Sequence, residues 1–155
     1  MRRVSTPQGV SRYHVRIWDR YKRPVASLAV LTDAQASWRP GRYNTDFWDC
    51  SVRFRFPVIK LLDWRKRRAE LEQSDNPFAT IVLAHLAAQE TGRNVRRRQT
   101  AKLALIRRLY ERGYDREQAL SLLRFIDWLV VLPPELEQQV LQEIEAIEEE
   151  DALYH

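Results

Sequence analysis

The residues of this chain that could hold a catalytic metal are, above all, its aspartates. Nucleases that use Mg²⁺ bind the metal with clustered carboxylates, because the metal must stabilise the charge that develops on the reacting phosphate. The aspartates outside the C-terminal segment fall at expected strand ends, turns and a helix end, where Asp is common for its turn chemistry. We therefore assign no catalytic residue and no metal ligand among these candidates: Asp19, Asp33, Asp46, Asp49 and Asp63.

Histidine and cysteine offer no recognisable pattern either. His14, His85 and His155 are isolated in the sequence, Cys50 is single, and no spacing resembles a zinc site. A Cys–His nucleophilic pair would need a base positioned beside Cys50, and nothing in the sequence supplies one. The four glycines stand singly, so there is no glycine-rich phosphate loop.

Positive charge is the remaining chemical feature, and it could serve phosphate binding. A phosphate contact requires only a cation at the right distance, so clusters on helix surfaces fit both nucleic-acid binding and ordinary solvation. Exposed tryptophans could stack on bases, although tryptophan in strands and helices is more often part of a core. The candidate nucleic-acid-binding residues are Arg12, Arg16, Arg53, Arg55, Arg96, Arg97, Arg98 and Lys102, and the tryptophans considered are Trp38, Trp48, Trp64 and Trp128.

The charges are strongly segregated along the chain. Residues 1–125 hold 26 Lys and Arg against 12 Asp and Glu, a net charge of +14, whereas residues 126–155 hold nine acidic residues and no basic one. This pattern suggests a polyanionic partner, an internal mimic of one, or both. The alternative is that the acidic segment neutralises a basic neighbour within the same fold.

Length and composition bound the class of protein. The chain has 155 residues, of which 45% are hydrophobic and 30% charged, which is typical of a globular protein of about one domain. A single cysteine excludes an internal disulfide and fits a reducing compartment. Residues 1–13 lack the apolar stretch of a signal peptide, and the apolar runs elsewhere are too short to span a bilayer. We expect a soluble cytoplasmic protein without a membrane partner.

The first 62 residues predict a small α/β portion. Residues 10–22 have helical periodicity, and Pro24 ends that helix. Residues 24–32 are almost continuously apolar, as in a strand covered on both faces. Residues 43–48 and 51–61 predict two further strands, the second with an apolar face at alternate positions and Pro57 as a bulge or edge signal.

The rest of the chain, residues 63–155, predicts about five helices. Asn76 followed by Pro77 marks a helix start, Gly92 and Gly113 mark helix ends, and Asp115 opens a capping box. The last helix begins at Pro133-Pro134, with a seam of Leu136, Val140, Ile144 and Ile147. The predicted fold class is α+β, with a boundary near residue 62 and the helical region packed on the first part.

The predicted strands are too few for a complete α/β domain. A buried strand needs hydrogen-bonding partners on both edges, and one helix cannot cover both faces of a sheet. Either another chain completes the sheet, or the sequence is a piece of a longer protein.

Several segments, taken in order, resemble one protein family. The chain over about residues 12–150 is similar to bacterial Rpn-type, YhgA-like transposases, which belong to the PD-(D/E)XK nuclease superfamily. The similar segments are 13–21 (YHVRIWDRY), 23–33, 38–40 (WRP), 47–48, 53–63, 74–78 (SDNPF), 109–114 and 123–129.

This resemblance implies a partial restriction-endonuclease-like core and, for intact members, a Mg²⁺-dependent DNA endonuclease associated with recombination or transposition. The family's metal-binding aspartate and its E-x-Q or E-x-K strand lie upstream of the helix that corresponds to residues 11–21. Here residues 1–10 contain no Asp or Glu, and the E-x-Q at Glu137–Gln139 falls in the wrong element. We therefore expect a truncated or degenerate member, inactive alone, needing no cofactor and keeping nonspecific DNA affinity.

Two alternatives stay open. A partner chain could supply the missing strands and carboxylates and so restore nuclease activity. Alternatively, the chain is an interaction or assembly module whose acidic helix at 134–151 docks on a basic surface. Exposed strand edges near residues 25–31 also favour a homo-oligomer.

Overall fold

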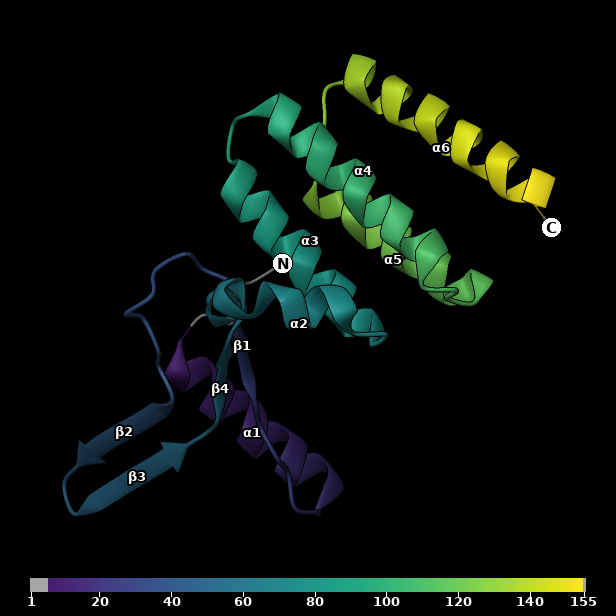
Figure 1. The fold of residues 1–155 in the computed structure, drawn as a ribbon. Helices are drawn as coiled ribbons and strands as arrows, with labels where there is room; N and C mark the ends of the chain where they lie inside the picture. The colour runs from purple at the N-terminus through teal and green to yellow at the C-terminus, as the bar shows by residue number, and fades with distance from the viewer. Residues whose placement is uncertain (1–5, 155) are drawn as a thin grey trace. The chain divides into compact units, whose positions relative to one another are not determined.

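The computed structural model describes the backbone of residues 6–154 and the side chains of residues 6–146 (Figure 1). The described chain is α+β, as the sequence predicts. The predictions made above for residues 1–5, for the side chain of Ile147 and for His155 lie outside the described residues. The elements are α1 (Pro7–Tyr21), β1 (Ala29–Leu31), β2 (Arg42–Phe47), β3 (Cys50–Arg55), β4 (Val58–Lys60), a 3-10 helix (Leu61–Arg67), α2 (Arg68–Gln73), α3 (Pro77–Thr91), α4 (Val95–Glu111), α5 (Arg116–Leu129) and α6 (Pro134–Tyr154).

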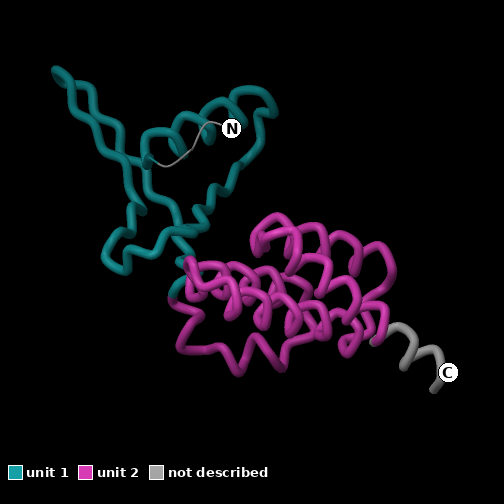
Figure 2. Tube along the Cα trace, turned by 90° about the horizontal axis from the view of Figure 1, so that it is seen from above, with its two compact units in different colours: residues 1–62 teal, residues 63–155 magenta. Residues whose placement is uncertain are grey.

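The chain divides into two compact units (Figure 2). Unit 1 is Met1–Leu62 and contains α1 and the four strands, and unit 2 is Asp63–His155 and contains the helices α2 to α6.

Helix α1 starts earlier than the periodicity predicts, because Thr6 supplies an N-cap. The Thr6 Oγ1 accepts a hydrogen bond from the Gly9 N–H at 3.2 Å, and Pro7 occupies the first turn, where its missing N–H costs nothing. Lys22 ends the helix in the left-handed conformation, and its N–H donates to the Trp18 carbonyl. Pro24 follows, as the sequence predicts.

Unit 1 contains two separate two-stranded sheets among its described residues. β1 pairs in parallel with β4, and β2 pairs antiparallel with β3. The prediction of a long strand over residues 24–32, covered on both faces, is wrong. β1 has only three residues, and Leu28 and Val30 keep about half of their surface exposed. One face of the β1–β4 pair is therefore open and apolar.

The single strand predicted over residues 51–61 divides at Pro57. Proline has no N–H for a ladder hydrogen bond, so the β3 ladder ends at Arg55, and the Pro57 carbonyl accepts instead from Ala29 of β1. Of the predicted inner face, Phe56 is buried, whereas Val52 is half-exposed. Pro57 thus directs the chain from the hairpin into the second sheet.

Unit 2 has its core among α3, α4 and α5. Helix α3 is apolar on all sides because α2, α4 and α5 all contact it. The predicted caps are confirmed: the side chains of Asn76 and Asp115 accept from the Phe78 and Gln118 amides, and Gly113 has a positive φ. The buried apolar core comprises Leu71, Ala79, Leu83, Ala84, Leu86, Ala87, Leu105, Leu109, Leu122, Ile126 and Val130.

Helix α6 contributes a smaller apolar cluster. Val140 is buried with Ile106 and Leu132, and Leu136 and Ile144 pack against them. This confirms the predicted seam as far as Ile144. The predicted helix at 63–71 is found as two pieces, the 3-10 helix Leu61–Arg67 followed by α2, which reaches Gln73.

Candidate nucleic-acid interface

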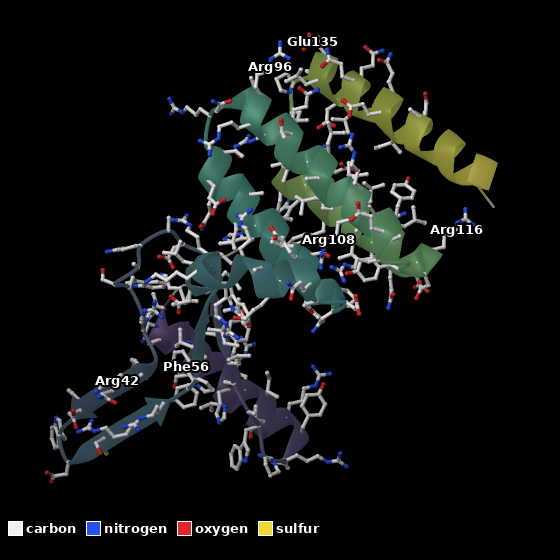
Figure 3. The ribbon with its side chains drawn as sticks, in the orientation of Figure 1. Arg42, Phe56, Arg96, Arg108, Arg116 and Glu135 are labelled. Atoms are coloured by element: carbon white, nitrogen blue, oxygen red, sulfur yellow. The ribbon has the colours of Figure 1, made fainter. Side chains whose placement is uncertain are left out.

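One face of the β2–β3 hairpin carries three exposed arginines. The register pairs Arg42 with Arg55 and Asn44 with Arg53, so these side chains share one face of the ribbon. Figure 3 labels Arg42 on β2. Side chains directly opposite each other lie about 5 Å apart at Cβ, and like charges there are destabilising. The Arg42–Arg55 pair therefore lowers the stability of the hairpin unless an external anion binds.

The third arginine of this face is partly neutralised. Arg53 Nη1 donates to Asp46 Oδ2 at 2.9 Å, with both side chains more than half exposed. This hydrogen bond lowers the pKa of Asp46 and raises the pKa of Arg53. Arg53 is thus a weaker phosphate ligand than the sequence suggested, while Arg55 is placed as predicted. Arg42 was not predicted, because only the strand register shows that it faces Arg55.

The opposite face of the hairpin holds it against α1. The rings of His14 and Phe54 lie 4.8 Å apart, and Phe54 lies 5.5 Å from the buried Phe56. His14 Nδ1 also shares a hydrogen bond of 2.9 Å with Ser27 Oγ. These contacts explain His14 as a packing residue and fix the arginine face on the exposed side.

Helix α1 presents a second row of exposed arginines. Arg12, Arg16 and Arg20 recur every four residues, which places them on one side of the helix. Arg12 and Arg16 are therefore exposed, as a phosphate contact requires. Arg20 was missed, although its spacing from Arg16 is a signal in the sequence.

Unit 2 carries two exposed arginines at the start of α4. Arg96 and Arg97 lie in the first turn, which has no acidic residue, and Figure 3 shows Arg96 at that end of the helix. The positive end of the helix dipole disfavours cations there. Arg96 and Arg97 therefore do not stabilise the start of α4, and a different role would explain their position.

Arg98 and Lys102 correct the predicted set. Arg98 is half-buried and donates to the carbonyls of Gly92 and Val131, so it ties the ends of α3 and α5. Lys102 is 1% exposed and its Nζ bonds Glu137 at 2.7 Å and Asp127 at 3.0 Å. Lys102 is not a surface cation, and the guanidinium of Arg98 is already bound to two backbone carbonyls, so we remove both from the candidate nucleic-acid-binding residues. A buried, paired lysine cannot be told from a surface lysine by its sequence position.

The five aspartates considered for metal binding lie on different elements. Asp19 pairs with Lys22, Asp46 with Arg53, and Asp33 with Lys60, whereas Asp49 is exposed in the hairpin turn and Asp63 lies in the 3-10 helix. Among the residues with described side chains, no group of three His, Cys, Asp or Glu could hold a metal ion.

An open groove runs along β1 within unit 1. It has a volume of about 850 Å³ and is bordered by the first turns of α1, by residues 28–35, and by Trp38, Pro40 and Phe56. Ala29 directs its N–H toward β4, so the alternation of the strand directs the backbone groups of Leu28 and Val30 toward the other edge. Among the described residues of unit 1, no strand pairs with this edge of β1 beside the groove.

Comparisons with protein-family models, with curated proteins and with solved structures give no significant match. Among the described residues, no helix is both long and apolar enough to cross a membrane.

Proposed function

We propose that this chain is a PD-(D/E)XK-related module that binds nucleic acid nonspecifically. The observation that carries the proposal is the exposed Arg42–Arg55 pair on the hairpin. Two cations held opposite each other cost stability in the free protein, and a phosphate backbone across the ribbon would relieve that repulsion. The resemblance to the transposase family adds DNA as the expected polyanion.

The other exposed arginines support the same proposal. Arg12, Arg16 and Arg20 form a row on α1, and described residues 6–62 hold ten Lys and Arg against four Asp. Such a surface attracts phosphate over a long range and without sequence preference. The arginine pair Arg96 and Arg97 would add contacts from unit 2.

We further propose that the chain alone does not cleave DNA. Three of the five candidate aspartates are held in ion pairs with Lys22, Lys60 and Arg53. A carboxylate that is already bound to a cation, and that lies far from the other carboxylates in the chain, is poorly placed to share a metal with a second carboxylate. Plasmid DNA incubated with Mg²⁺ should therefore remain supercoiled, and metal-dependent nicking by the pure chain would refute this part.

Binding is tested by a salt titration with a short duplex. Each phosphate contact contributes about 0.9 to the slope of log K against log salt. The double variant Arg42→Gln/Arg55→Gln should reduce that slope by about 1.8. The matched control Arg116→Gln/Arg124→Gln removes two exposed charges from α5 and should leave the slope unchanged. Equal loss in both variants would mean that net charge, rather than the hairpin, governs binding.

A second candidate function, self-assembly, is favoured by the edge of β1 that no strand within residues 6–154 covers. A two-stranded sheet is marginal on its own, and Leu28, Val30 and Ile59 leave its face apolar and exposed. We propose a second copy as the occupant, because antiparallel β1–β1 pairing would set the uncharged Val30 against itself and give a four-stranded sheet.

The two candidates have opposite salt dependences. Two basic copies of unit 1 repel each other, so salt should strengthen the dimer, whereas it weakens nucleic-acid binding. Sedimentation velocity at low and high salt should show more dimer at high salt. Val30→Lys should abolish the dimer, and Val131→Lys, which alters an exposed valine of unit 2, should not. A monomer at every salt concentration would refute the second candidate.

A further inference from the structure

The tip of the β2–β3 hairpin exposes two large aromatic rings. Phe47 is the last residue of β2 and is 75% exposed, and Trp48, the first residue of the two-residue turn, is 90% exposed. Their ring centroids lie 6.3 Å apart and the ring planes are inclined by 42°. The tip is therefore an aromatic surface open to solvent.

Folding stability does not account for Trp48. The side chain buries almost none of its surface, so it contributes little hydrophobic free energy. Its φ is 54°, in the left-handed region, where glycine is favoured at the first position of a two-residue hairpin turn. The other described residues with positive φ end helices: Gly92 and Gly113 are glycines, and Lys22 is the one further non-glycine residue. Trp48 is therefore both exposed and held in a backbone conformation that costs free energy, and such strained residues cluster at ligand-binding sites.

The arginine face of the same hairpin indicates which partner the tip would meet. Arg53 lies midway along β3, and the Arg42–Arg55 pair lies at the end of the ribbon remote from the turn, so the arginines lead from the base of the hairpin toward its tip. The alternation of β2 places Phe47 on the face opposite to the arginines, whereas Trp48 stands in the turn at the end of the ribbon. A phosphate backbone held along the arginines would therefore bring its bases to Trp48 first, with Phe47 packed beside it. Aromatic side chains stack on every base, since every base has a π-face, but only unpaired bases offer that face.

We propose that the Phe47–Trp48 tip stacks on unpaired bases and makes the hairpin prefer single-stranded DNA to duplex DNA. This inference rests on the proposed nucleic-acid binding and specifies its substrate. Arginines hold the backbone and the tip engages the bases, so the two contributions separate experimentally. Loss of arginines changes the salt dependence, and loss of the ring changes the discrimination between single strand and duplex.

The test compares a fluorescein-labelled oligo(dT) with a duplex of the same length, at one fixed low salt concentration, by fluorescence anisotropy. Trp48→Gly removes the ring and places a favoured residue at the positive φ, so the hairpin should be preserved. We expect this variant to bind oligo(dT) about 5- to 150-fold more weakly, the range for loss of one stacked base, and to bind the duplex unchanged. The control Trp128→Ala, which removes another exposed indole, 71% exposed, from α5, should bind both as the original chain does.

Two results would overturn the inference outright, and a third would require a second variant. Equal affinity of the original chain for both DNAs, with no effect of Trp48→Gly, would refute the stacking tip and leave the proposed function intact. Binding to neither DNA would refute both proposals. Equal weakening for both DNAs would mean that the tip acts on the duplex or that the hairpin has changed. Trp48→Asn, a second residue that tolerates positive φ, then decides: loss of single-strand preference without loss of duplex affinity supports the tip, and any other result refutes it.

Discussion

The ammonium of Lys60 is completely buried and donates to both carboxylate oxygens of Asp33, at 2.7 and 2.9 Å. Lys60 is the last residue of β4, and Asp33 follows β1 closely, so the pair joins the ends of two parallel strands. The same ammonium donates to the Trp38 carbonyl at 3.1 Å. The pair therefore fixes the loop over residues 33–40 beside the groove.

The two partners of this pair should differ in their importance for stability. Asp33→Asn leaves a buried ammonium without a counter-charge, which is strongly unfavourable. Lys60→Met leaves only Asp33, which is 36% exposed and can be solvated by water. Urea denaturation should show a clearly larger loss of stability for Asp33→Asn than for Lys60→Met. The reverse order would mean that the lysine is not buried in solution.

The same pair predicts a pH dependence. The hydrogen bond from Lys60 holds the pKa of Asp33 below its ordinary value. A carboxyl with a lowered folded pKa stabilises the fold above its unfolded pKa, about 3.9, and loses that contribution as the pH falls through the folded pKa. The difference in unfolding free energy between the original chain and Asp33→Asn should be constant near neutral pH and shrink below about pH 4. A difference that stays constant as the pH falls from neutral to well below about 4 would contradict this prediction.

Arg108 should be the most sensitive arginine of unit 2. Its guanidinium is buried among α2, α3 and α4, and Figure 3 labels Arg108. It donates to Thr80 Oγ1 and to the backbone carbonyls of Leu71, Glu72 and Ser74. These carbonyls close the C-terminal end of α2, where a cation is favoured. Arg108→Met should cost about 3 kcal/mol in unfolding free energy, because several buried acceptors lose their donors.

The neighbouring residue provides the control for Arg108. Arg107 is exposed and reaches Glu143 at 3.4 Å, a weak surface ion pair. Arg107→Met should therefore change stability by less than about 1 kcal/mol. Arg108→Lys should recover only part of the loss, since a lysine lacks the planar fork that reaches several carbonyls. Similar costs at positions 107 and 108 would contradict the buried network.

The sequence predicted the helices of unit 2 well because their signals are local. Asn76, Asp115 and Gly113 act on their own helix ends, so their residue types and spacing suffice. Strand register, by contrast, is set by tertiary pairing. The exposure of Val30 and the division of β3 from β4 at Pro57 depend on which strands pair with each other. No local sequence pattern predicts this pairing.

The candidate interface was predicted in part for the same reason. Helical periodicity predicts that Arg12 and Arg16 are exposed on one side of their helix, and strand alternation predicts that Arg55 is exposed. The position of Arg42 opposite Arg55 depends on the register of β2 with β3. The burial of Lys102 depends on where α5 and α6 place Asp127 and Glu137. Positive charge is easy to count in a sequence, but its burial is a property of the packed helices.

Glu137 should contribute more to the attachment of α6 than its neighbours. Its carboxylate accepts from Lys102 twice and from the Leu132 N–H at 3.1 Å, so it links α4 to the start of α6. Glu137→Ala should lower the unfolding free energy by about 2 kcal/mol, since hydrogen bonds to charged groups are lost and Lys102 keeps only Asp127. Glu135→Ala, at an exposed site in the same turn, should cost less than about 1 kcal/mol.

Lys102 provides the sharpest test that burial, and not sequence clustering, decides which cations contact DNA. It lies five residues after Arg97 on α4, yet its ammonium is bound by Asp127 and Glu137. Lys102→Met should therefore leave both the affinity for a short duplex and its salt slope unchanged, while Arg96→Gln/Arg97→Gln should lower the slope if α4 contributes contacts. Thermal denaturation of Lys102→Met must confirm a folded protein at the assay temperature. A loss of slope of about 0.9 in folded Lys102→Met would mean that the lysine leaves its carboxylates to bind phosphate, and would return it to the interface.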